Sequence, residues 1–140
     1  SNVEQWTPCV TNIYIDVENQ SRSAINLMKL LTKNQSMANE LPEGINIFFV
    51  MSSECALFDR LKCDIFALFR DNIRYIITKP HNVFTRIIVE SARDIIYRDV
   101  IILSSDKSAC TLKSVLDDMD TSRVINVLSS FDEFCALVFT

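Results

Sequence analysis

Glycine is the residue that this sequence most conspicuously lacks. The chain has 140 residues but only one glycine, Gly44, whereas average usage of about 7% would give roughly ten. The phosphate loops of P-loop proteins and of dinucleotide-binding folds each need several glycines, because their backbones approach the phosphates closely. The sequence therefore excludes both kinds of loop, and it excludes collagen-like chains and Gly/Ser linkers as well.

Histidine is equally scarce, and the cysteines form no recognisable pattern. His81 is the only histidine, and the five cysteines are an odd number without a Cys-x-x-Cys pair. Such spacings suit neither a zinc site nor a disulfide framework. We therefore expect reduced, buried thiols in an intracellular protein. The cysteines are Cys9, Cys55, Cys63, Cys110 and Cys135.

Long apolar runs and basic charge are also missing. No signal peptide and no apolar stretch of about 18 residues is present, so we expect no membrane partner. Fourteen Lys and Arg stand against 18 Asp and Glu, a net charge of −4, which argues against a broad basic face for nucleic acid and leaves room only for a local basic groove. The length suits one domain that folds without a metal or disulfide.

What the sequence does contain is an alternation of two apolar patterns. β-branched and aromatic runs of strand length occupy residues 10–15, 45–51, 73–78, 100–103 and 123–128. Apolar residues at helical spacing predict helices at residues 21–33, 54–70, 83–97, 107–116 and 131–138.

The strands are apolar on both faces, which is typical of a parallel sheet covered by helices on both sides. The predicted fold is a three-layer α/β sandwich with a five-stranded, mostly parallel sheet. Residues 10–140 are expected to form a single domain, residues 1–9 a loose N-terminal arm, and residues 34–44 a loop.

Three helix starts carry capping signals. Ser53 and Asn82 are the expected N-caps of the second and third helices. Ser130 with Glu133 three residues later forms a capping box for the last helix.

Carboxylates follow two of the predicted strands. Asp16 follows the first strand, and Asp106 follows the fourth. Ligands of open parallel sheets bind at the carboxyl ends of the strands, and two carboxylates there can share Mg²⁺ or Mn²⁺, since hard cations prefer oxygen ligands. An acid after a strand is also an ordinary helix cap. That alternative is stronger for Asp106 than for Asp16, which precedes its helix by several residues.

Two stretches resemble one nuclease family. Residues 13–19 (IYIDVEN) resemble the first-strand motif of the NYN branch of PIN-like nucleases, in which an apolar strand ends in Asp and an Asn follows shortly. Residues 100–108 (VIILSSDKS) resemble the fourth-strand motif, an apolar strand followed by Ser-Gly-Asp-x-Asp. The resemblance implies a PIN-like fold and RNA cleavage, in which clustered acids hold one or two Mg²⁺ or Mn²⁺ ions that activate a water.

The resemblance also assigns roles to residues. Asp16 and Asp106 match catalytic, metal-binding acids, and Asn19 matches the accompanying ligand-orienting Asn. The family expects a further acid near the start of the third helix, where residues 82–86 carry none, so Glu90 is the nearest candidate to complete the site.

Two further departures lie in the fourth-strand motif. Its second acid falls on Ser108, and its glycine falls on Ser105. We therefore expect a catalytically degenerate PIN-like domain, with no cofactor or only weakly bound Mg²⁺ or Mn²⁺. Such a domain would act as a protein-interaction or scaffolding module within a larger RNA- or chromatin-associated protein. The alternative is a metal-dependent endoribonuclease that uses Asp16 and Asp106.

Side chains for the expected partners are also present. Lys79, His81 and Lys107 stand near the expected strand ends, where they can contact RNA phosphates or simply be solvated. The helices at 54–70 and 131–138 are apolar on more than one face, so one side of each can meet a partner protein. The candidate interface residues are Phe58, Phe66, Phe131 and Phe134.

Overall fold

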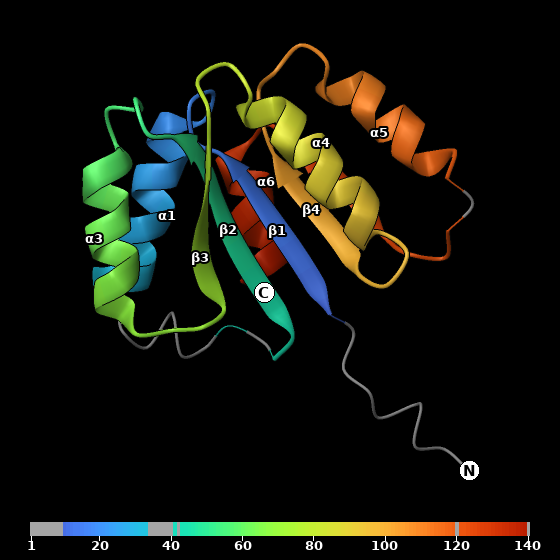
Figure 1. Cartoon of the computed structure of the whole chain (residues 1–140). Coiled ribbons are helices and arrows are strands. Elements are labelled where there is room, and N and C mark those ends of the chain that lie inside the picture. The colour runs from blue at the N-terminus through green and yellow to red at the C-terminus, as the bar shows by residue number, and fades with distance from the viewer. Residues whose placement is uncertain (1–9, 34–40, 42, 120, 140) are drawn as a thin grey trace.

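The computed structural model describes residues 10–33, 41, 43–119 and 121–139. It contains a five-stranded, all-parallel sheet with helices on both faces, which confirms the predicted α/β sandwich (Figure 1). The expected arm at residues 1–9 lies outside the described residues, as does most of the expected loop at 34–44. No helix in the described part of the chain is long and apolar enough to cross a membrane.

The strands and helices alternate along the whole described chain. The strands are β1 (Thr11–Asp16), β2 (Ile45–Ser52), β3 (Ile73–Thr78), β4 (Asp99–Leu103) and β5 (Ile125–Leu128). The helices are α1 (Ser21–Lys33), α3 (Phe58–Leu68), α4 (Val83–Asp94), α5 (Ala109–Asp117) and α6 (Phe131–Val138). The strand order is β3-β2-β1-β4-β5, so β1 is central and the order reverses between β1 and β4.

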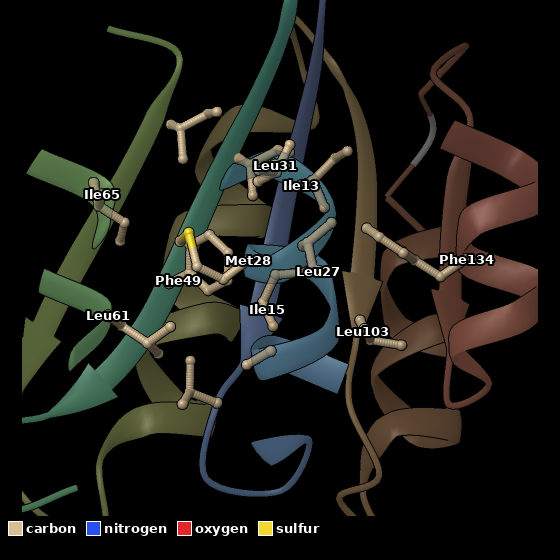
Figure 2. Packing of buried hydrophobic residues seen from close by; sticks show 14 of the residues in the cluster. Ile13, Ile15, Leu27, Met28, Leu31, Phe49, Leu61, Ile65, Leu103 and Phe134 are labelled. Carbon is tan, nitrogen blue, oxygen red and sulfur yellow. The ribbon is translucent and has the colours of Figure 1, made fainter. Parts of the chain in front are cut away.

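One apolar layer fills the space between the sheet and helices α1, α3 and α6. Met28 of α1 lies beside Phe49 of β2 and Leu27 beside Ile15 of β1, while Leu61 of α3 and Phe134 of α6 lie at the two sides of the layer (Figure 2). Side chains alternate between the two faces of a strand, so this face of β1 contributes only its odd-numbered residues.

The second apolar layer lies under α4 and α5. Tyr14 of β1 and Ile102 of β4 pack there with Ile87 of α4 and Leu116 of α5. Both faces of the sheet are therefore buried, which is why the strand sequences read as nearly continuous apolar runs.

Two helices begin later than predicted: α3 at Phe58 instead of residue 54, and α5 at Ala109 instead of residue 107. Residues 53–57 form turns instead of helix, because the N–H of Cys55 donates to the carbonyl of Ser52 and that of Phe58 to the carbonyl of Cys55. Helix α3 therefore begins at Phe58, and the prediction that Ser53 caps it is wrong. Asn82 does precede α4, but its side chain makes no capping hydrogen bond.

The predicted cap of α6 is present. The N–H of Glu133 donates to the Ser130 Oγ at 3.3 Å, which satisfies one of the free donors at the helix start.

Helix α3 ends at a phenylalanine in a backbone conformation that usually requires glycine. Its C-cap is Phe69, with φ 52° and ψ 44° in the left-handed region. Glycine usually occupies such a position, because a Cβ atom there costs about 1 kcal/mol or more. Phe69 is nevertheless 84% exposed and its ring lies 5.8 Å from that of Phe66.

The four candidate interface phenylalanines do not behave alike. Phe66 is 75% exposed, whereas Phe58 and Phe131 are half-buried and pack against the core. Phe134 is fully buried, so the prediction that it belongs to an interface is wrong. Helical spacing places it with Val138 on the face of α6 that meets the sheet.

The cysteines are only partly as expected. Four of the five are described, and all four are free thiols, but Cys63 and Cys110 are exposed. They lie on the solvent faces of α3 and α5, so the prediction of buried thiols is wrong for these two.

Replacing Phe134 with Ala should lower the free energy of unfolding by about 3–5 kcal/mol, because a fully buried ring leaves a cavity. The matched change Phe66→Ala removes an exposed ring and should alter it by about 0.5 kcal/mol or less. Urea denaturation of both variants measures the difference. Equal losses would contradict the burial of Phe134.

Candidate functional site

The candidate site lies where the strand order reverses, at the carboxyl ends of β1 and β4. Ile15 pairs with Leu103 in the parallel register, so the next residues, Asp16 and Ser104, stand side by side. Open α/β sheets bind ligands at this kind of position. The prediction that β1 and β4 deliver polar side chains to one edge is therefore consistent with the sheet register.

Asp16 is the centre of the site. Its side chain is fully buried, and its Oδ2 accepts hydrogen bonds from the Ser104 Oγ at 2.6 Å and from the Asn19 Nδ2 at 2.8 Å. Its Oδ1 is also buried and has no hydrogen-bond partner among the described residues. Asn19 thus orients Asp16 itself.

Asp106 contributes to the loop that follows β4. Its backbone N–H donates to the Ser104 Oγ at 3.1 Å, and its Oδ1 accepts from the backbone N–H of Ser108 at 2.8 Å. Ser104 therefore joins the two acids through one hydroxyl, donating to the first and accepting from the backbone of the second. The bond from the Ser108 N–H to the Asp106 carboxylate is a local side-chain-to-backbone contact of the kind found at helix caps.

Glu90 does not join the two aspartates. It is buried on α4, where its Oε1 pairs with the Arg86 Nε at 2.8 Å and its Oε2 with the guanidinium of Arg93. Both carboxylate oxygens are thus engaged by cations of the same helix.

Gln20 is a site residue that our sequence reading missed. It is buried, and its Nε2 donates to the Ser105 Oγ and, at 3.0 Å, to the carbonyl of Ser129, while its Oε1 accepts from the Ser23 Oγ at 2.6 Å. These contacts hold the start of α1 against the loops after β4 and β5. The available signal was helical spacing, since Gln20 lies four residues before the buried Ala24.

A second polar cluster lies on the same face of β1, nearer the amino end of the strand. The Tyr14 hydroxyl donates to the Asp94 Oδ2, and the Asn12 Nδ2 donates to the same oxygen at 2.8 Å. The Asn12 Oδ1 in turn accepts from the Asn46 Nδ2 at 3.0 Å. This cluster ties the end of α4 to the centre of the sheet.

The three possible phosphate contacts do not converge. Lys79 lines a cleft of about 660 Å³ beyond β3, whereas Lys107 lines another of about 520 Å³ beyond β4 and β5. Strands β3 and β4 are three inter-strand steps apart, or about 14 Å. His81 is exposed, with φ 68°, and lines neither cleft.

The described residues do not fit the metal centre that the family resemblance implies. The unpartnered Oδ1 of Asp16 is a suitable ligand atom. However, among the described residues no three His, Cys, Asp or Glu side chains lie close enough to share a metal ion. Ser108, at the position of the motif's second acid, offers no carboxylate.

Replacing Ser104 with Ala should destabilise the fold by about 1–3 kcal/mol, because the buried Asp16 carboxylate loses a donor. Ser129→Ala, at an exposed serine of the neighbouring loop, is the matched control and should change stability by about 0.5 kcal/mol or less. Urea denaturation measures both. Similar midpoints for the two variants would mean that the Ser104 hydroxyl does not support Asp16.

Tyr14 should make stability depend on alkaline pH. Burial raises its pKa most, followed by its hydrogen bond to Asp94 and the charge of that carboxylate. The tyrosine ionises first in the unfolded chain, so the contribution of Tyr14 to the free energy of unfolding should be constant below about pH 10 and fall as the pH rises above it.

Tyr14→Phe removes the hydroxyl and should make that fall shallower, as measured by denaturant titrations below and above pH 10. Tyr97→Phe, at an exposed tyrosine, is the matched control and should keep the wild-type slope. An unchanged slope in Tyr14→Phe would contradict the prediction.

Comparison with known proteins adds no relative to this description. No protein-family model, no curated protein and no solved structure matches the chain. Any function assigned to the chain therefore rests on the fold, on the contacts described above and on the two motif-like stretches.

Proposed function

We propose that the chain is a catalytically degenerate PIN-like domain that acts as a protein-interaction module. The observation that carries the proposal is the pairing of Glu90, the acid needed to complete a nuclease site, with Arg86 and Arg93. A guanidinium already occupies one lone pair of each oxygen of this carboxylate, and the two positive charges disfavour the approach of a metal cation.

The energetics of Glu90 support this reading. A buried carboxylate is tolerated when it is paired, and breaking such a pair leaves an uncompensated charge. Moving Glu90 toward Asp16 would break two ion pairs and leave Arg86 and Arg93 facing each other without the anion between them. The pairing thus favours a structural role for this acid.

The other two acids are also engaged, though less completely. The Asp16 Oδ2 accepts from Ser104 and Asn19, and the Asp106 Oδ1 accepts from the backbone of Ser108. Both acids therefore accept hydrogen bonds that stabilise the fold and do not require a cation.

Exposed aromatic rings support the interaction part of the proposal. Phe66 and Phe69 form a contacting pair on the surface at the end of α3. Aromatic side chains are enriched in protein interfaces. Phe69 also holds a backbone conformation better suited to glycine, and residues kept in such conformations cluster at functional sites. The exposed Phe66–Phe69 surface is therefore suited to binding a partner protein.

A second candidate function is metal-dependent RNA cleavage of the NYN type. It is favoured by one observation, the buried Oδ1 of Asp16 that has no hydrogen-bond partner among the described residues. An ion held by Asp16 and Asp106 would satisfy that oxygen. We rank this candidate second because the contacts of Glu90 oppose it.

Titration with Mn²⁺ under heteronuclear NMR separates the two functions. For an interaction module, paramagnetic broadening should stay diffuse at millimolar Mn²⁺, and the protein should leave a labelled RNA intact. Asp16→Asn is the matched variant, since it keeps the shape of the side chain and removes its charge. Broadening centred on Asp16 and Asp106 at micromolar Mn²⁺, with RNA cleavage that Asp16→Asn abolishes, would establish the nuclease instead.

A further inference from the structure

Strand β3 is one edge of the sheet. It pairs with β2 alone among the described strands and lies outside β2 on the side of the sheet near α3 (Figure 1). The carbonyl of Asn72 accepts from the N–H of Ile47 on β2. Backbone groups alternate along a strand, so Tyr75 and Ile77 turn their N–H and C=O groups away from β2. These groups are available to an added strand.

Clefts open at both ends of this edge. The first, of about 710 Å³, lies between the end of α3 and the start of β3 and is lined in part by Phe66, Phe69 and Tyr75. The second, of about 660 Å³, lies beyond the end of β3 and is lined in part by Ile77 and Val89. An extended peptide running along β3 would therefore find a recess for side chains at each end.

The walls of both clefts expose apolar side chains. Phe66, Phe69, Ile77 and Val89 are all among the exposed large hydrophobic residues of the described chain. Exposed apolar patches with polar surroundings mark sites of protein contact. Recognition by strand addition combines main-chain hydrogen bonds with pockets for side chains, and both are present here.

The charge of these clefts is opposite to that of the whole chain. Lysine and arginine outnumber aspartate in their linings by five to two. Because Arg86 is paired with Glu90, five positive charges face three negative ones, a local balance of +2, while the chain as a whole carries −4. The basic residues are Lys62, Arg70, Arg74, Lys79 and Arg86, and the acidic ones are Asp59 and Asp71.

We propose that the β3 edge binds an extended, acidic peptide segment of a partner protein by strand addition. Bulky apolar side chains of the peptide would be seated against Phe66 and Phe69, and its carboxylates beside the cleft lysines and arginines. This inference rests on the proposed interaction function and names the class of partner. A second copy of the chain is a poorer occupant, because pairing two β3 edges would bring like charges together.

The probe is a phage-displayed library of random peptides about twelve residues long, enough to extend past both ends of β3. Selection on the folded chain should enrich acidic sequences in which aromatic or β-branched residues alternate. A synthetic copy of an enriched peptide should perturb the NMR signals of β3 and α3. Failure to enrich any peptide, or enrichment without acidic bias, would overturn the proposal.

Two substitutions at Ile77 test the main-chain contacts. Ile77→Pro removes the outward N–H, and the ladder to β2 survives because proline is tolerated on an edge strand when its nitrogen faces solvent. It should weaken binding of the selected peptide about tenfold or more. Ile77→Thr keeps the N–H and should bind much more like the wild type. Equal loss in both variants would mean that the peptide does not add a strand.

The aromatic contact has its own matched pair. Phe66→Ser should weaken binding about tenfold or more, while Tyr97→Ser, an exposed aromatic residue after α4, should leave binding unchanged. Thermal denaturation confirms that each variant is folded before its binding is scored. An unchanged affinity in folded Phe66→Ser would show that the peptide does not contact Phe66 and would overturn this part of the proposal.

A competition assay separates this inference from the proposed function. A single-stranded RNA that displaces the peptide and loses its own binding in Phe66→Ser would assign the edge to RNA and overturn the inference. A peptide whose NMR perturbations lie away from β3 would also overturn it, but would leave the interaction module standing. Only Mn²⁺ binding at Asp16 together with RNA cleavage overturns the module itself.

Discussion

The described structure depends on a line of polar side chains buried along one face of its central strand. Asn12, Tyr14 and Asp16 of β1 all point toward α4 and α5, where water does not reach. Each must find partners within the protein, because a buried polar group without one costs about 1–3 kcal/mol. Asp94 from α4 and Ser104, directly after β4, supply them. The placement of α4 on the sheet and the course of the chain after β4 follow from this requirement.

The same requirement gives the polar residues at the carboxyl ends of β1 and β4 a structural role that needs no metal ion. Asp16 accepts hydrogen bonds from Ser104 and Asn19 through its Oδ2, and Ser104 accepts one from the backbone of Asp106, while the Asp16 Oδ1 has no partner among the described residues. Glu90 is stabilised on its own helix. The exposed apolar side chains and the clefts of the proposed peptide site lie instead along β3, the edge strand two positions from β1.

Local patterns predicted the fold well, because helix and strand periods and the burial of a parallel sheet on both faces leave clear traces in sequence. They also predicted that Asp16 and Asp106 follow their strands at one edge of the sheet, and the order of the strands then brings Asp16 beside Ser104. Other features depend on how elements pack. The Tyr14–Asp94 contact joins residues 80 positions apart. Phe66 and Phe134 occupy similar helical patterns, and only the orientation of each helix on the sheet decides which ring is buried.

The central position of β1 also sets an order of assembly. Asn12 and Asn46, which join β1 to β2, are 34 residues apart, whereas Asp16 and Ser104, which join β1 to β4, are 88 apart. Closing the longer loop costs more chain entropy, and pairing over long sequence distances is slow. We therefore expect the β1–β2–β3 half to form first, with the Asp16 carboxylate still in water. Docking of β4 would then dehydrate it, so the candidate site would close only after that half has formed.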